Sequence, residues 1–351
     1  MNVEKLQNKK VYLRIYGDFS HLFIDEVQNI PRWQLFVNRL LRQGLHILLT
    51  GSNANLLSEE LATHLTGRYN EIRLFPFSFL EYCIVKKVNI ENRYTKAIGL
   101  REHALDEYLL NGGFPETLHE EWKSSDSAIY TRSLLNTIIN KDIRKRYKIR
   151  YQTTLNTIAN TILDTFCQEL NFETIRSQYQ VKSVQTVKNY VSFLEQAFLV
   201  RILHKYSYKS VERQTGQKSY VVDNSFISNR ENALQPQNLG WRLENAIAIE
   251  LLRRQKYADE QLYYLKDNNR FEVDFVLTER NLVTELIQVT YDFSNPTTKQ
   301  YNREIGGLIK ASAQTHCDNL TLIMMYGEAG ERIIDGKIIH CKLAMDWLLR
   351  Q

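Results

Sequence analysis

The stretch HLFIDEVQ at His21–Gln28 combines a short apolar run with an acidic pair. Leu22–Ile24 is apolar throughout, and Asp25 and Glu26 follow it directly. A buried strand of a parallel sheet has this composition, with acidic residues where the chain leaves the sheet at its carboxyl end. The stretch therefore predicts an α/β fold built on a parallel sheet.

A second strand of the same kind follows in HILLTGSNA at His46–Ala54. Ile47–Leu49 is its apolar run, and a helix that starts near Pro31 separates the two strands, since proline is favoured in a first helical turn. Small polar side chains at the end of this strand, Ser52 and Asn53, would reach a γ-phosphate or an attacking water. The two strands together predict a nucleotide site at one edge of the sheet.

The residue types at this edge suit phosphoryl transfer. In nucleotide hydrolases an aspartate at the place of Asp25 holds Mg²⁺, and a neighbouring glutamate such as Glu26 polarises the attacking water. Further along, LTGRYNEIRLFPFSFLEY at Leu65–Tyr82 contains Arg68, which could neutralise charge on a transferred phosphoryl group. A surface or structural role is the alternative for this arginine.

These segments resemble an AAA+-type family of bacterial and archaeal ATPases whose members carry a C-terminal domain of unknown function. NGGFPETL at Asn111–Leu118 and the C-terminal pattern are also similar, so the resemblance covers nearly the whole chain. It implies ATP and Mg²⁺ as cofactors. It also implies Asp25 and Glu26 as Walker B residues, Ser52 or Asn53 as a sensor, and Arg68 as an arginine finger.

The chain departs from that family in its phosphate-binding loop. The first twenty residues do not spell GxxxxGK[ST], and neither Gly336-Lys337-Ile338 nor Gly216-Gln217-Lys218-Ser219 restores the pattern. We therefore expect an incomplete P-loop NTPase core that binds ATP weakly or not at all, in a protein that acts as a regulatory or binding module. A partner protein or self-association would cover the strand edge that such a core exposes.

Length and composition set the remaining bounds. A chain of 351 residues predicts two or three domains, which we place at residues 1–82, 83–215 and 216–351. Four scattered cysteines without a CxxC pair fit a reducing cytosol, and no apolar run reaches the ~18–20 residues of a membrane span. These features predict a cytoplasmic protein. The net charge of +5 permits DNA binding without arguing for it.

The region 83–215 predicts helices with a helix–turn–helix. Phe172–Tyr179 and Ser183–Ala197 would be its helices, and residues 199–210 alternate enough to form the wing hairpin of a winged helix. Lys182, Lys188 and Asn189 would face outward and suit phosphates and base edges. The alternative is a packing module without DNA contact. The basic run KDIRKRYKIR at Lys141–Arg150 has the same two interpretations, a phosphate-binding strip or a solvated helix face.

The C-terminal region predicts the element order α-β-β-β-α-β, which resembles a restriction-endonuclease-like core, a mixed α/β fold. That core places a helix glutamate, a strand aspartate and an E-x-K motif around metal ions. Glu244 and Asp274 match the two acids as metal ligands, but the E-x-K position is occupied by Gln288-Val289-Thr290. A metal-dependent nuclease and a non-catalytic binding domain therefore both remain open.

Overall fold

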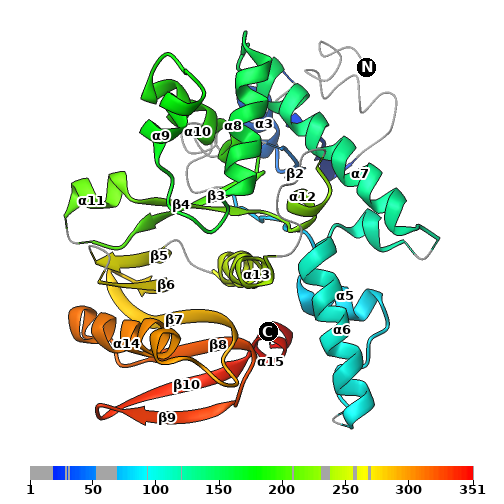
Figure 1. Ribbon diagram of the computed structural model, residues 1–351. Coiled ribbons are helices and arrows are strands. Elements are labelled where there is room, and N and C mark those ends of the chain that lie inside the picture. The colour runs from blue at the N-terminus through cyan, green and yellow to red at the C-terminus, as the bar shows by residue number, and fades with distance from the viewer. Residues whose placement is uncertain are drawn as a thin grey trace. The chain divides into compact units, whose positions relative to one another are not determined.

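The computed structural model describes residues 19–27, 30, 32–52, 69–92, 94–119, 121–207, 209–230, 238–255, 259–267 and 270–350 (Figure 1). The chain divides into two compact units, one of residues 1–73 with 196–198, the other of residues 74–195 with 199–351. The fold is mixed α/β, as predicted. Asn53 and Arg68 lie outside the described residues, so their predicted roles stay predictions.

The first unit contains the two predicted parallel strands. β1 (His21–Ile24) pairs in parallel with β2 (His46–Leu49), and α3 (Trp33–Leu41) connects them. α3 and one face of the strands enclose a small apolar core around Val27. The opposite face carries Phe23 and Leu48, which are 72% and 52% exposed. Among the described residues, this apolar face of the two strands is therefore exposed, although their apolar composition is typical of buried strands.

The second unit is built on one eight-stranded mixed sheet with the order β4-β3-β5-β6-β7-β8-β10-β9. Its strands are β3 (Val200–Lys205), β4 (Gln217–Val221), β5 (Glu260–Asp267), β6 (Phe271–Glu279), β7 (Leu282–Asp292), β8 (Leu320–Tyr326), β9 (Gly330–Ile334) and β10 (Lys337–Leu343). β7, β8 and β10 run parallel, while β6 is antiparallel to both β5 and β7. The predicted boundary between residues 215 and 216 falls between two strands of this sheet.

The C-terminal elements follow the predicted order α-β-β-β-α-β: α13 (Leu239–Arg254), β5, β6, β7, α14 (Thr298–Thr315) and β8. Arg280 and Asn281, with φ values of 49° and 68°, form the tight turn between β6 and β7. α13 packs against β4 and β7, and α14 packs against β6, β7 and β8 (Figure 1). α15 (Ala344–Leu349) ends the described chain beside β8 and β10.

The middle of the chain is helical. Its elements are α5 (Phe79–Val85), α6 (Thr95–Asn111), the 3₁₀ turn η2 (Pro115–Leu118), α7 (Ser124–Thr137), the π-helix η3 (Ile138–Lys145), α8 (Gln152–Asp164), α9 (Phe172–Gln178) and α10 (Val184–Gln196). The backbone N–H of Thr186 donates to Ser183 Oγ at 3.2 Å, so Ser183 caps the N-terminus of α10. None of the described helices is long and apolar enough to cross a membrane.

The predicted wing hairpin within residues 199–210 is wrong. That segment supplies one strand, β3, whose antiparallel partner is β4 at residues 217–221, beyond the short helix α11 (Ser210–Thr215). β3 also pairs in parallel with β5. Alternating side chains predict a strand but not its partner, because pairing depends on which other strand lies alongside.

A buried polar junction explains the NGGF segment after α6. Gly112 has a φ of 75°, which turns the chain so that the N–H of Gly113 donates to Asp223 Oδ2 at 2.7 Å. The same carboxylate accepts from the N–H of Ser225, at the start of the short helix α12 (Ser225–Ser228). Asn224 donates to the carbonyl oxygens of Leu109 and Arg242. The junction thus ties α6 to the end of β4 and to α13.

Candidate functional site

A polar cavity of about 590 Å³ lies among β4, β6, β7, α13 and α14. Both predicted metal ligands of this unit line it, Glu244 from α13 and Asp274 from β6. The structure therefore brings together two acids that are far apart in the sequence. The cavity also contains two charged residues that the sequence did not single out as site residues, Lys218 from β4 and Glu272 from β6.

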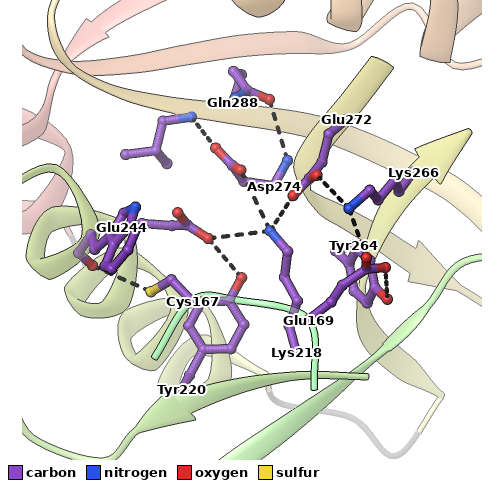
Figure 2. Close-up of polar contacts among 12 residues, drawn as sticks. Cys167, Glu169, Lys218, Tyr220, Glu244, Tyr264, Lys266, Glu272, Asp274 and Gln288 are labelled. Atoms are coloured by element: carbon purple, nitrogen blue, oxygen red, sulfur yellow. Dashed lines mark hydrogen bonds and ion pairs between the residues drawn. The ribbon is translucent and has the colours of Figure 1, made fainter. Parts of the chain in front are cut away.

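The ammonium of Lys218 lies among three carboxylates (Figure 2). Its Nζ is 2.5 Å from Glu272 Oε1, 3.6 Å from Glu244 Oε1 and 4.0 Å from Asp274 Oδ1. Glu272 and Asp274 are two residues apart on β6, so both side chains point to the same face of the sheet. The Lys218 side chain is only 4% exposed, so the ion pairs are shielded from bulk water.

Hydrogen bonds hold the carboxylates in place. Tyr220 Oη donates to Glu244 Oε1 at 2.9 Å, and the backbone N–H of Val289 donates to Asp274 Oδ2 at 2.9 Å. Gln288, in the predicted E-x-K position, accepts from the N–H of Asp274 at 3.3 Å. Its Nε2 donates to Glu304 Oε2 at 2.7 Å. Both polar atoms of the Gln288 side chain are therefore used in hydrogen bonds that link β6 to α14.

The charges of the cluster are unequal. Burial and the Glu244 charge raise the pKa of Asp274 well above its usual value, and burial raises the pKa of Glu244 despite the nearby Lys218. Glu272 is the exception: burial opposes its ionisation, but Lys218 and Lys266 outweigh that effect and lower its pKa. Burial disfavours the charged form of Lys218, yet the three acids raise its pKa overall. The stable pattern is an ionised pair of Lys218 and Glu272 beside two acids that tend to hold protons.

A second layer extends the network outward. Lys266 Nζ lies 3.5 Å from Glu272 and 2.6 Å from Glu169, and Tyr264 Oη donates to Glu169 at 2.8 Å. On the inner side, Cys167 Sγ donates to the carbonyl of Trp241 at 3.3 Å (Figure 2). Burial and Glu244 raise the pKa of this thiol, so Cys167 is not an activated nucleophile.

The residues present do not fit a divalent metal ion. An ion bound by Glu244 and Asp274 would have to displace the Lys218 ammonium, because Nζ itself lies 3.6 Å and 4.0 Å from these two carboxylates and is paired with Glu272. In the described ranges, no three His, Cys, Asp or Glu side chains are grouped so as to hold a metal. Thr290, where a lysine was expected, accepts a hydrogen bond from Gln300. The predicted metal roles of Glu244 and Asp274 thus have no support in this geometry.

Lys218 and Glu272 were missed for different reasons. Glu272 carried a signal, because the strand EVD places two acids on one face. No sequence signal marked Lys218 as a partner of these acids, because it lies on β4, a strand far from β6 in the chain. The sequence drew attention to it only as part of Gly216-Gln217-Lys218-Ser219, an imperfect phosphate loop.

The residues of the predicted nucleotide edge lie together in the first unit. Thr50 Oγ1 donates to Asp25 Oδ1 and accepts from the N–H of Glu26 at 3.1 Å. Ser52 Oγ donates to Glu26 Oε2 at 3.1 Å, and Glu26 has a left-handed φ of 48°. Asp25, Glu26 and Ser52 therefore meet where the sequence placed them, with Thr50 as an additional residue. Their catalytic and binding roles stay predictions.

The predicted nucleic-acid residues lie on the helix–turn–helix. Lys182, Lys188 and Asn189 are exposed, as expected. Lys188 Nζ lies 5.5 Å from the centre of the Phe172 ring, and Asn189 Oδ1 accepts from Gln185 Nε2 at 2.8 Å. Two of the three side chains are therefore engaged with neighbours of their own unit.

Comparison with known proteins identifies the families and relatives that this chain resembles. The chain matches models of an AAA domain over residues 2–83, a domain of unknown function (DUF8612) over residues 102–236 and a domain of unknown function (DUF4143) over residues 239–330. It is 33% identical over 320 residues to an uncharacterized protein of Methanocaldococcus jannaschii, covering 89% of this chain and 69% of that protein. It is 30% identical over 338 residues to an uncharacterized protein of Haemophilus influenzae, covering 94% and 78%. No solved structure matches.

Proposed function

The chain belongs to the same family as these two uncharacterized relatives and matches an AAA domain over residues 2–83. From that premise we propose that it is a regulatory or binding module that does not hydrolyse ATP by itself. In this proposal the first unit contributes the Walker B edge of a nucleotide site. The second unit contributes a binding function through its polar cavity and does not cut nucleic acid.

The observation that supports the nucleotide role is the hydrogen-bonded edge of β1 and β2. Thr50 orients the Asp25 carboxylate, and Ser52 orients that of Glu26, at the carboxyl ends of two parallel strands. This is where open α/β sheets bind phosphates and Mg²⁺. Asp25 would hold the magnesium through water, and Glu26 would polarise the attacking water once a phosphate loop is supplied.

The two stretches that come closest to a phosphate loop are engaged elsewhere. Lys218, in Gly216–Ser219, is buried on β4 and paired with acids. Lys337 begins β10, and its Nζ lies 2.5 Å from Asp318. Neither lysine is free to contact β- and γ-phosphates, so we propose that this chain alone binds ATP weakly or not at all.

Calorimetric titration with Mg-ATP tests this proposal. We expect no saturable heat at micromolar nucleotide for this chain. Where the reading frame encodes a phosphate loop upstream, the same titration on the longer chain should show binding that Asp25→Asn weakens. Hydrolysis by the extended chain should fall at least ~100-fold in Glu26→Gln, because the general base is removed. Micromolar binding by this chain alone, lost in Asp25→Asn, contradicts the proposal.

For the second unit, the element order and the positions of Glu244 and Asp274 support a nuclease-like frame, while Lys218 opposes the metal on which cleavage would depend. We therefore expect no Mg²⁺- or Mn²⁺-dependent cutting of single- or double-stranded DNA. A gel assay of the wild type beside Asp274→Ala tests this directly. Cutting that depends on metal and disappears in Asp274→Ala would assign a nuclease activity instead.

A further inference from the structure

The second unit has the element order of a nuclease-like core, but a lysine ammonium lies among its acids. This combination points to a specific role for that lysine. We infer that Lys218 is the resident cation of the polar cavity, its ammonium taking the place that a divalent metal ion would need among Glu244, Glu272 and Asp274. This inference deepens the binding role proposed for the second unit, and it rests on that proposal only in assigning no metal chemistry to the cavity.

The geometry of the cluster supports it. One Nζ atom contacts carboxylate oxygens from an α-helix and from a strand, at 3.6 Å from Glu244, 2.5 Å from Glu272 and 4.0 Å from Asp274. An ammonium at the point where three carboxylates converge is electrostatically a bound cation that is covalently tethered to β4. Unlike a metal ion, it cannot be lost to a chelator.

The surroundings of Lys218 hold it there. Its side chain is 4% exposed, and Nζ also lies 5.3 Å from the centre of the Tyr264 ring, a cation–π contact. Directly upstream on the chain, a Cβ at Gly216 would lie 2.7 Å from Tyr264 Oη and from Lys205 Cβ. A side chain at position 216 would therefore clash with Tyr264 of β5 and with Lys205 of β3.

The charge balance explains why one ammonium is enough. Lys218 offsets the ionised Glu272, while Glu244 and Asp274 share hydrogen bonds with Tyr220 and the Val289 N–H. Removing the lysine charge leaves Glu272 and two neighbouring acids with no cation between them, so that their side chains can close on a small ion. A small divalent ion with oxygen preference, such as Mn²⁺, suits such a group.

Manganese binding followed by the EPR signal of free Mn²⁺ tests the inference on the full chain. We compare the wild type with Lys218→Met, which keeps the length of the side chain and removes its charge. Lys266→Met is the matched control, because Lys266 also contacts Glu272 but lies at the outer side of the cluster, 25% exposed. We expect Lys218→Met to bind one Mn²⁺ at least tenfold more tightly than the wild type and Lys266→Met.

Stability supplies the second measurement. Wild-type melting should be unchanged by EDTA or Mn²⁺, whereas Lys218→Met should melt lower and regain part of the loss when Mn²⁺ is added. If Lys218→Met does not fold, Lys218→Gln, which keeps a hydrogen-bond donor, takes its place. If neither folds, the wild-type titration decides: binding of Mn²⁺ that Asp274→Asn abolishes overturns the inference, and its absence supports it.

Two further results would overturn the inference. One is a folded Lys218→Met that binds Mn²⁺ no better than the wild type, because the carboxylates would then not form a cation site. The other is Lys266→Met gaining the same affinity, because a general gain in negative charge would then explain the effect. None of these measurements involves ATP, so failure here is separate from failure of the proposed nucleotide role.

Discussion

Lys218 on β4 lies 2.5 Å from the Glu272 carboxylate on β6, although β3 and β5 stand between these strands in the sheet. Both residues belong to the predicted domain of residues 216–351, but β3, which lies between their strands, comes from the predicted region 83–215. The charged cluster is therefore a property of the eight-stranded sheet as a whole. Its energetics can be tested by substitutions that separate charge from packing.

Asp274→Asn should stabilise the protein increasingly as pH rises. An unfolded aspartate titrates near ~3.9, and burial raises the pKa of Asp274 in the folded protein. The folded state therefore holds the proton longer, and wild-type stability at this site is present at acid pH and is lost as pH rises from about 4 towards the folded pKa. Asparagine does not ionise, so it avoids this loss. Urea unfolding of both proteins from pH 4 to 8, followed by tryptophan fluorescence, measures the difference.

Asp292→Asn is the matched control, because the pKa of Asp292 is lowered by its hydrogen bond from the Ser294 N–H. The sign should be opposite: the wild-type carboxylate is favoured above its unfolded pKa, so the asparagine variant should lose relative stability as pH rises. A stability difference for Asp274→Asn that does not change with pH would contradict the prediction. So would one that shrinks as pH rises.

Gly112→Ala should destabilise the second unit by at least ~3 kcal/mol, because strained backbone and a buried clash add. Gly112 has a φ of 75°, and an added Cβ would lie 1.7 Å from Asp223 Oδ1. The carboxylate would have to move away from the N–H of Gly113, which breaks the junction between α6 and β4. Equilibrium urea denaturation followed by circular dichroism measures the change.

Gly99→Ala is the control for that experiment, since Gly99 lies within the same helix α6 and no heavy atom would approach its Cβ within 4 Å. Alanine there should be neutral or stabilising by ~0.5–1 kcal/mol, because glycine loses more backbone entropy in a helix. Equal losses in both variants would show that the junction around Asp223 is not what makes Gly112 necessary.

Thr50→Val should destabilise the first unit by ~1 kcal/mol, because it removes the hydroxyl shared by the Asp25 carboxylate and the Glu26 N–H. Valine keeps the shape and β-propensity of threonine, so the change isolates the hydrogen bonds. Native-state hydrogen exchange at the β1 and β2 amides is the measurement. Thr50→Ser, which keeps the hydroxyl, should exchange as the wild type does, and equal protection in Thr50→Val would rule out a positioning role for this hydroxyl.

Local patterns predicted most single elements, because helix and strand periodicity is a property of neighbouring residues. The predicted order α-β-β-β-α-β placed Asp274 on a strand, and it lies on β6. The predicted E-x-K position, Gln288-Val289-Thr290, also lies on a strand, β7. The apolar-acidic strand end also placed Asp25 beside Ser52, because the carboxyl ends of parallel neighbouring strands lie at one edge.

The sequence by itself determined the α/β class, the sheet edge where Asp25 and Glu26 meet Ser52, and the presence of Glu244 and Asp274 in one frame. These follow from patterns within short segments and from the order of elements. Only the tertiary structure decided that β3 joins β4 and β5 rather than forming a wing, and that Lys218 is the cation facing the acids. The physical reason is that sheet pairing and burial bring together residues far apart in the chain, and no local periodicity encodes which strands meet. The positive charge at the centre of the cavity is there because the folded sheet brings Lys218 of β4 next to the acids of β6 and α13.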